Sequence, residues 1–145
     1  MITTDYANED DGDDLYLLFS DWDGDDLCSR EVFDASFDRL VSGANNMVLV
    51  AREGERLVGY AQIIACDELG FNRFYEVAAL LVAKTERSRG IGRMLMERVE
   101  AIARANGIRE IKLSSQVFRS RAHVFYEGLG FEFYKISKFY AKKVV

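Results

Sequence analysis

The apolar positions of this 145-residue chain follow two spacings, one typical of helices and one typical of strands. Apolar residues at a period of about 3.6 predict four helices, over residues 13–19, 29–41, 92–105 and 120–129. Short apolar runs bounded by polar or glycine residues predict six strands, over residues 47–51, 57–65, 74–82, 108–113, 131–134 and 138–144. The first two strands are expected to form a hairpin through residues 52–56, and the last two an antiparallel pair. Hairpins combined with one strand–helix–strand crossover favour an α+β layer fold.

Two of the expected helices carry clear boundary signals. Ser29 is a good N-cap, and the apolar stripe that follows it consists of Val32, Phe33, Phe37, Leu40 and Val41. The stripe of the helix over residues 92–105 consists of Met94, Leu95, Val99 and Ile102. Gly107, after Asn106, is a typical helix stop. Because no repeat or low-complexity linker divides the chain, residues 1–145 are expected to form a single domain.

The turn between the expected strand 74–82 and the expected helix 92–105 is the main candidate for a binding site. Its residues are Arg87, Ser88, Arg89, Gly90, Ile91 and Gly92. First-turn N–H groups of a helix lack internal partners and carry the positive end of its dipole, so this turn can hold a phosphate. Glycine lets the backbone approach the anion without a Cβ in the way. The spacing differs from that of the P-loop and of the dinucleotide fingerprint, and an ordinary tight turn is the alternative.

The R-x-x-G-x-G spacing of this turn resembles the acyl-CoA-binding signature of the GNAT superfamily of N-acetyltransferases. A second string, A-x-x-F-Y-x-x-x-G-F-E over residues 122–132, resembles the C-terminal half of the same family. The two strings stand in the family's order, and the resemblance covers residues 46–145. It implies a three-layer α/β arrangement, in which helices flank a mixed, mostly antiparallel central sheet.

The resemblance also implies acetyl-CoA as the acyl donor. Its diphosphate would lie on the backbone N–H groups of residues 88–93, with positive charge added by Arg89 and Arg93. By family analogy, its pantetheine arm would pair with the backbone of Leu80, Leu81 and Val82 in the manner of an added strand. A buried strand with no ligand is the alternative for that segment.

Two side chains take catalytic roles by the same resemblance. Tyr126 stands where the family often places a tyrosine near the thioester sulfur, and a phenol can protonate the leaving thiolate. Packing beside Phe125 is its alternative role.

Glu76 lies eleven residues before Arg87, where the histone-acetylating branch has a catalytic glutamate. A partly desolvated carboxylate on an apolar strand can take up the amine proton. An exposed strand-end glutamate, with ordered water as the base, is the alternative.

The composition is that of an ordinary globular protein, 49% apolar and 30% charged. No apolar run is long enough to span a membrane, and the N-terminus lacks the features of a secretory signal. Cys28 and Cys66 are expected to be free thiols in a cytoplasmic protein. The single histidine, His123, argues against a zinc site and is expected to be a half-buried or surface helix residue, although contact with the cofactor is the alternative.

Charge is distributed unevenly along the chain. Residues 1–38 hold 13 acidic side chains against one base, Arg30, whereas the remainder holds 11 acids and 18 bases. The acidic part argues against nucleic-acid binding there and can attract a cationic substrate, or it is simply a solvated acidic face. The resemblance implies that the region of Trp22 helps wall the acceptor site. Its aromatic ring and the neighbouring carboxylates of Asp21, Asp23, Asp25 and Asp26 would suit a cationic amine. Their spacing lacks the distal glutamate of a calcium loop, so no metal is expected.

These features together favour an N-acetyltransferase that moves an acetyl group from acetyl-CoA to a primary amine of a small cationic molecule. The amine would attack the thioester directly, since no Cys or Ser lies in a nucleophile motif. A backbone N–H near Val82 would polarise the thioester carbonyl. The alternatives are a protein-lysine acetyltransferase, favoured by Glu76, and a non-catalytic acyl-CoA-binding sensor. A homodimer is compatible with the resemblance, but no sequence feature establishes it.

Overall fold

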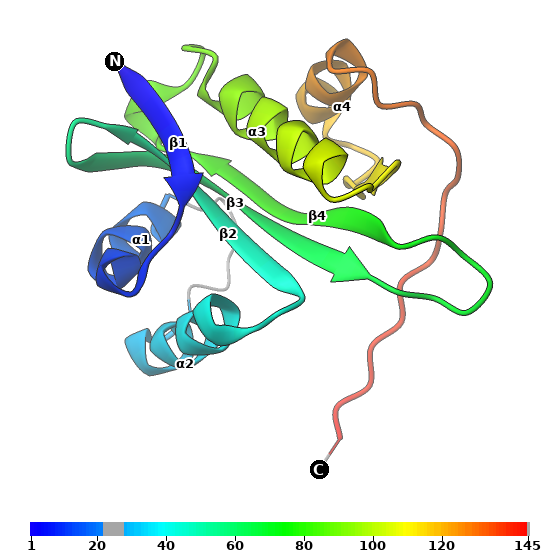
Figure 1. The fold of residues 1–145 in the computed structure, drawn as a ribbon, viewed down its shortest axis with the longest axis horizontal. Helices are drawn as coiled ribbons and strands as arrows, with labels where there is room; N and C mark the ends of the chain where they lie inside the picture. The colour runs from blue at the N-terminus through cyan, green and yellow to red at the C-terminus, as the bar shows by residue number, and fades with distance from the viewer. Residues whose placement is uncertain (22–27, 145) are drawn as a thin grey trace. The chain divides into compact units, whose positions relative to one another are not determined.

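The computed structural model describes residues 1–21 and 28–144, which divide into two units, Met1–Ser114 and Ser115–Val145. The first unit contains a five-stranded sheet (Figure 1). Its strands, in their order across the sheet, are β1 (Ile2–Tyr6), β2 (Asn46–Glu53), β3 (Arg56–Cys66), β4 (Phe74–Val82) and β5 (Ile111–Lys112). Neighbours from β1 to β4 pair antiparallel, and β5 pairs parallel with β4. The expectation of a mixed, mostly antiparallel sheet is therefore confirmed.

Helices cover both faces of this sheet, which confirms the layered arrangement (Figure 1). Helices α1 (Gly12–Phe19) and α2 (Arg30–Ser42) pack on one face, and α3 (Ile91–Ala105) packs on the other. The core on the first face consists of Leu15, Leu18, Phe37, Val50, Leu57, Tyr60 and Leu81. Gly59, next to Tyr60 and therefore on the opposite face, leaves room for Ile91 and Leu95 of α3.

Local sequence signals account for the boundaries of these elements. The Ser29 side chain accepts a hydrogen bond from the N–H of Val32 and caps α2 as predicted. Val32 itself is 58% exposed, so it lies outside the apolar stripe in which the sequence placed it. The β2–β3 hairpin turns at Gly54, whose φ of 64° suits the short connection between these strands. Met96 is buried on α3 although the expected stripe omitted it.

Two strands at the ends of the sheet differ from expectation. β1 was not predicted, because its alternating Ile-Thr-Thr-Asp-Tyr pattern is short and lies in an acidic segment. β5 covers two residues, not the six of the expected strand 108–113, because only Ile111 and Lys112 pair with β4. A strand exists only as far as its neighbour supplies hydrogen-bonding partners, and the sequence does not show where that neighbour ends.

The second unit contains helix α4 (Ser120–Gly128), close to the predicted 120–129, and the segment that follows it. The predicted antiparallel strands 131–134 and 138–144 are wrong, since residues 131–144 form neither strand nor helix. Short apolar runs there suggested strands. However, the connection Lys135-Ile136-Ser137 has no residue that favours positive φ, so no tight hairpin turn forms, and an isolated two-stranded pair is marginal in water.

Candidate functional site

The segment that joins β4 to α3 has an unusual backbone. After β4, the N–H of Ala83 donates to the carbonyl of Val58 at 2.9 Å, and a short 3-10 turn follows over Lys84–Glu86. Ser88 then has a φ of 67° and Gly90 a φ of 80°, both in the left-handed region. Ser88 is the one non-glycine residue with positive φ among those the structure describes. Left-handed residues within a turn can direct neighbouring N–H groups toward a common point, which suits an anion.

Gly90 is the N-cap of α3, and no side chain caps this helix end. A Cβ placed on Gly90 would meet no described atom beyond its chain neighbours within 4 Å, so a side chain at this position would have room. The first-turn N–H groups of α3, from Ile91 through Arg93, have no partners within the helix and no side-chain cap. Uncapped donors at the positive end of a helix dipole are chemically able to bind an anion.

The arginine side chains of the turn are largely engaged with protein groups. Arg87 Nε donates to the carbonyl of Val82 at 3.3 Å, and Arg93 lies 3.9 Å from Glu97 on the next turn of α3. Arg89 forms ion pairs with Glu53, at 2.5 Å, and with Glu86. The predicted charge contribution of Arg89 is therefore balanced by two carboxylates.

Glu86 lies at the centre of this ion-pair cluster. It is buried to 8% exposure and also pairs with Arg56, at 2.5 Å. Hydrogen bonds from Arg56 and then from Arg89 lower the pKa of the Glu86 carboxyl. The hydrogen bonds that Arg89 donates to Glu53 and then to Glu86 raise the pKa of its guanidinium. The cluster, defined here as Glu53, Arg56, Glu86 and Arg89, holds two positive and two negative charges and is neutral as a whole.

The second part of the site is the outer edge of β4. Leu80, Leu81 and Val82 pair with β3 on their inner side, while β5 pairs with β4 only at Tyr75 and Glu76. The register shift between Gln62 and Ile63 leaves Ala78 as a bulged residue, which twists the strand between these two stretches. Among the described residues, no strand pairs with the outer edge of β4 beyond Glu76. Unpaired backbone groups on such an edge can bind an extended amide chain.

Glu76 is the last residue of β4 that pairs with β5, opposite Lys112, and it is half-buried. Its Oε2 accepts a hydrogen bond from the Cys66 thiol at 3.8 Å. Burial, followed by the nearby Glu76 carboxylate, raises the pKa of that thiol. A carboxylate in this position, in contact with one weak donor, retains lone pairs with which to accept a proton.

Tyr126 belongs to the second unit, and its surroundings there are aromatic. Its ring makes edge contacts with Phe125, at 5.3 Å between centroids, and with Phe131, at 5.9 Å. Burial raises the pKa of the Tyr126 phenol, so the hydroxyl stays protonated at neutral pH. His123, on the same helix, is half-buried and its Nε2 lies 2.9 Å from the carbonyl of Gln116, as a local helix histidine would.

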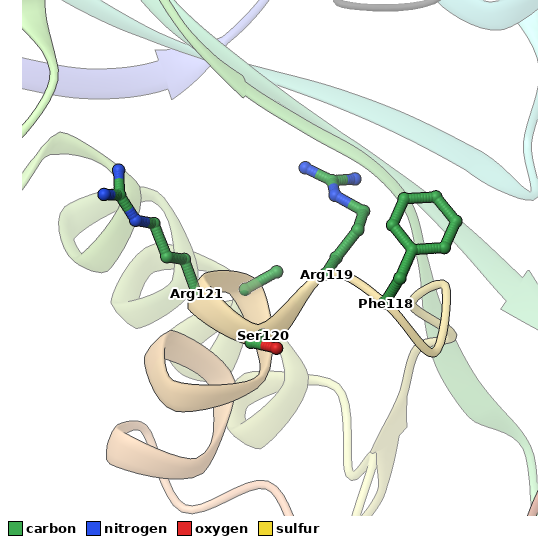
Figure 2. A pocket seen from close by; sticks show the side chains of 5 residues that line it. Phe118, Arg119, Ser120 and Arg121 are labelled. Atoms are coloured by element: carbon green, nitrogen blue, oxygen red, sulfur yellow. The ribbon is translucent and has the colours of Figure 1, made fainter.

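The second unit also has a hollow at the start of α4 that the sequence did not reveal. Its volume is about 410 Å³, and Phe118, Arg119, Ser120, Arg121 and Ala122 line it. Figure 2 shows the guanidinium groups of Arg119 and Arg121 on one side of the chain, with Phe118 beside Arg119. The signal that could have identified it is the Arg-Ser-Arg sequence directly before the A-x-x-F-Y string.

The expected acceptor wall is described only in part, since Trp22, Asp23, Asp25 and Asp26 lie outside the described residues. Asp21 is described, and its Oδ2 accepts a hydrogen bond from the Lys84 N–H at 2.9 Å. This bond joins the end of α1 to the segment after β4.

Within residues 1–21 and 28–144, no three Cys, His, Asp or Glu side chains converge as a metal site requires. None of the helices in that part of the chain has the length and apolar character needed to cross a bilayer.

Comparison with known proteins gives one family and many similar folds. The model of the acetyltransferase (GNAT) family matches residues 9–131. An IAA acetyltransferase of Azospirillum brasilense is 36% identical over 83 residues, which is 57% of this chain and 52% of that protein. This chain thus matches about half the length of that relative.

Among solved structures, the aminoglycoside N-acetyltransferase AAC(6')-Iy in complex with CoA has a TM-score of 0.86 at 17% identity, over 99% of this chain and 96% of that one. AAC(6')-IG from Acinetobacter haemolyticus has a TM-score of 0.83 at 16% identity, over 99% of each chain. A transcriptional regulator from Bacillus halodurans C-125 has a TM-score of 0.81 at 23% identity, over 97% of this chain and 100% of that one. At these identities the likeness concerns the fold.

Proposed function

Since this chain belongs to the acetyltransferase (GNAT) family, we propose that it transfers an acetyl group from acetyl-CoA to a primary amine of a small cationic molecule. The observation that carries the proposal is the turn before α3. There, left-handed Ser88 and Gly90 precede a helix N-terminus that has no side-chain cap, and a Cβ on Gly90 would have room. We further propose that both units, residues 1–145, form one acetyltransferase domain, since the family match runs from residue 9 to residue 131.

Acetyl-CoA is the donor substrate, and this chain's backbone supplies most of its binding groups. The N–H groups of residues 88–93 bind the diphosphate, which is favoured there by the dipole of α3. The outer edge of β4 at Leu80, Leu81 and Val82 accepts the pantetheine amides as an added strand would. A backbone N–H near Val82 polarises the thioester carbonyl and stabilises the oxyanion as it forms.

The chemistry is direct acyl transfer. The neutral amine nitrogen forms a bond to the thioester carbonyl carbon, and the carbon–sulfur bond then breaks to release a thiolate. Glu76 takes the proton that the amine must lose, directly or through water, and Tyr126 gives a proton to the thiolate sulfur. The raised pKa of Tyr126 keeps its phenol protonated until the thiolate forms. The acidic residues of the first third of the chain favour a cationic amine.

Glu76 also favours a second candidate, a protein-lysine acetyltransferase. A carboxylate placed at the open edge of β4 can deprotonate a lysine ammonium as well as a small amine. The two functions differ only in the acceptor. A panel that contains both acceptor classes therefore separates them.

The experiment that tests the proposal is mass-spectrometric detection of acetylated products. Acetyl-CoA is incubated with the protein and with polyamines, aminoglycosides, amino acids or lysine peptides. Acetylation of a small cationic amine supports the proposal, and acetylation of peptides alone supports the second candidate. Absence of any acetylated product from protein that binds acetyl-CoA would contradict both and leave a binding-only role.

Two variants then test the catalytic roles. Tyr126→Phe removes the proposed general acid and should lower kcat by about 10²-fold or more while the KM for acetyl-CoA is kept. Tyr134→Phe, at an exposed tyrosine of the same unit, is the matched control and should not change kcat. Glu76→Gln should lower kcat most at low pH, where a free amine is scarce, with the exposed Glu68→Gln as its control. Full activity of Tyr126→Phe would remove the general-acid role.

A further inference from the structure

The ion-pair cluster of Glu53, Arg56, Glu86 and Arg89 connects the segment before α3 to the β2–β3 hairpin. Glu86 and Arg89 lie in the segment between β4 and α3, whereas Glu53 and Arg56 flank the turn of the β2–β3 hairpin. Glu86 accepts from Arg56 on one carboxylate oxygen and from Arg89 on the other. Arg89 in turn reaches Glu53 through both of its terminal nitrogens, at 3.3 and 2.5 Å.

The cluster spans the strained part of the turn. Ser88, with its φ of 67°, lies between Glu86 and Arg89, so the ion pair between those two residues closes the chain around it. A non-glycine residue adopts positive φ at an energetic cost and keeps it only where the surrounding contacts enforce it. No other residue of the turn contributes a buried charge, because Glu86 and Asp11 are the buried charged residues of the described chain.

We propose that Glu86 is a positioning residue for the diphosphate of the acyl donor. Through Arg89 and Arg56 it holds residues 87–90 in the conformation that aims the N–H groups of the turn at the anion. The inference rests on the proposed function, because it concerns the same site. It also changes the role expected of Arg89, whose guanidinium binds two protein carboxylates and whose contribution to the ligand comes through its backbone N–H.

The charge of Glu86 makes the proposal sharply testable. Glu86→Gln removes a negative charge close to an anion site, so a purely electrostatic effect would tighten CoA binding. Loss of positioning has the opposite sign, because the released turn must be ordered again when the diphosphate binds. The direction of the change in Kd therefore distinguishes the two effects.

The experiment measures the Kd of CoA by calorimetry, and kcat and KM for two acyl donors, acetyl-CoA and S-acetylpantetheine. The second donor carries the thioester and the pantetheine amides but lacks the diphosphate. For Glu86→Gln we expect the Kd of CoA and the KM of acetyl-CoA to rise by about tenfold or more, the size expected when charge-assisted contacts are lost. The kcat with acetyl-CoA should remain unchanged, and so should both kcat and KM with S-acetylpantetheine.

Glu100→Gln is the matched control, since it removes one negative charge and one ion pair, with Arg104, elsewhere in the same unit. If Glu86→Gln does not fold, Glu53→Gln replaces it, because it removes one end of the cluster while Glu86 keeps both arginines. Its expected effect is smaller but has the same selectivity for the diphosphate-bearing donor.

Three results would overturn the positioning role: an unchanged Kd, tighter binding, or equal losses with both donors. Equal losses would mean that Glu86 acts only on general stability. A wild-type chain that binds neither CoA nor acetyl-CoA would refute the proposed function and this role with it. A wild-type chain that binds CoA no better than Glu86→Gln does would refute this role alone.

Discussion

Gly90→Ala is the substitution that best separates the proposed phosphate-binding role of the turn from its contribution to stability. Gly90 has a φ of 80°, and alanine pays about 1–2 kcal/mol to adopt the left-handed conformation. No protein atom lies within 4 Å of the added methyl group, so the stability cost comes from the backbone alone. Under the proposed function, the same methyl group is added next to the N–H groups that would bind the diphosphate.

The expected loss of affinity follows from the hydrogen bonds that the methyl group displaces. A hydrogen bond to a charged group is worth about 1.5–3 kcal/mol, so the loss of a single one weakens CoA binding by about tenfold or more. Urea denaturation gives the change in the free energy of unfolding, and calorimetric titration with CoA gives the change in Kd.

Gly107→Ala is the control for Gly90→Ala. Gly107 follows the other end of α3, has a φ of 71° and also has no atom within 4 Å of an added Cβ. Both substitutions should therefore reduce the free energy of unfolding by a similar amount, while only Gly90→Ala should weaken CoA binding. If the two variants bind CoA equally well, the N-terminus of α3 does not hold the diphosphate and the reasoning is refuted.

Three further predictions concern stability and use urea denaturation. Gly59→Ala places a Cβ 3.0 Å from the Leu81 carbonyl oxygen and should cost about 1–3 kcal/mol, and an unchanged midpoint would contradict this packing. Phe37→Ala should cost about 3–5 kcal/mol, because this ring is only 7% exposed, whereas Val32→Ala on the same helix should cost little. The lowered pKa of Glu86 means that its ion pairs stabilise the fold at neutral pH, and this stabilisation should disappear as the pH falls through the ordinary glutamate value of about 4.3 and below. Glu86→Gln should show a flatter pH dependence there, and equal slopes would contradict the assignment.

Features encoded by neighbouring residues were predictable from the sequence. The strand 74–82 was predicted with the bounds that β4 has, because this run is apolar except at Glu76 and ends at a polar segment. The Ser29 cap of α2 was predicted because capping involves only the next three residues. The family was also recognisable from two short strings, and the match over residues 9–131 confirms it.

Features that depend on pairing between distant segments were not predictable in this way. Strand β1 forms because residues 2–6 pair with β2, whose residues lie more than forty positions further along the chain. The expected strands 131–134 and 138–144 have suitable side chains but no paired backbone. Strand propensity describes which residues tolerate a pleated conformation, whereas hydrogen-bonding partners decide whether a strand exists.

The candidate site shows the same division. By itself, the sequence determined the Arg87–Gly92 turn, because glycine spacing and a helix start are local properties of the chain. Only the tertiary structure decided that Arg89 binds Glu53 and Glu86, and that Glu86 is buried. Arg89 and Glu53 are 36 positions apart, and the hairpin that brings them together is placed by the pairing of β2, β3 and β4. An ion pair depends on distance in space, and that distance exists only after the sheet has formed.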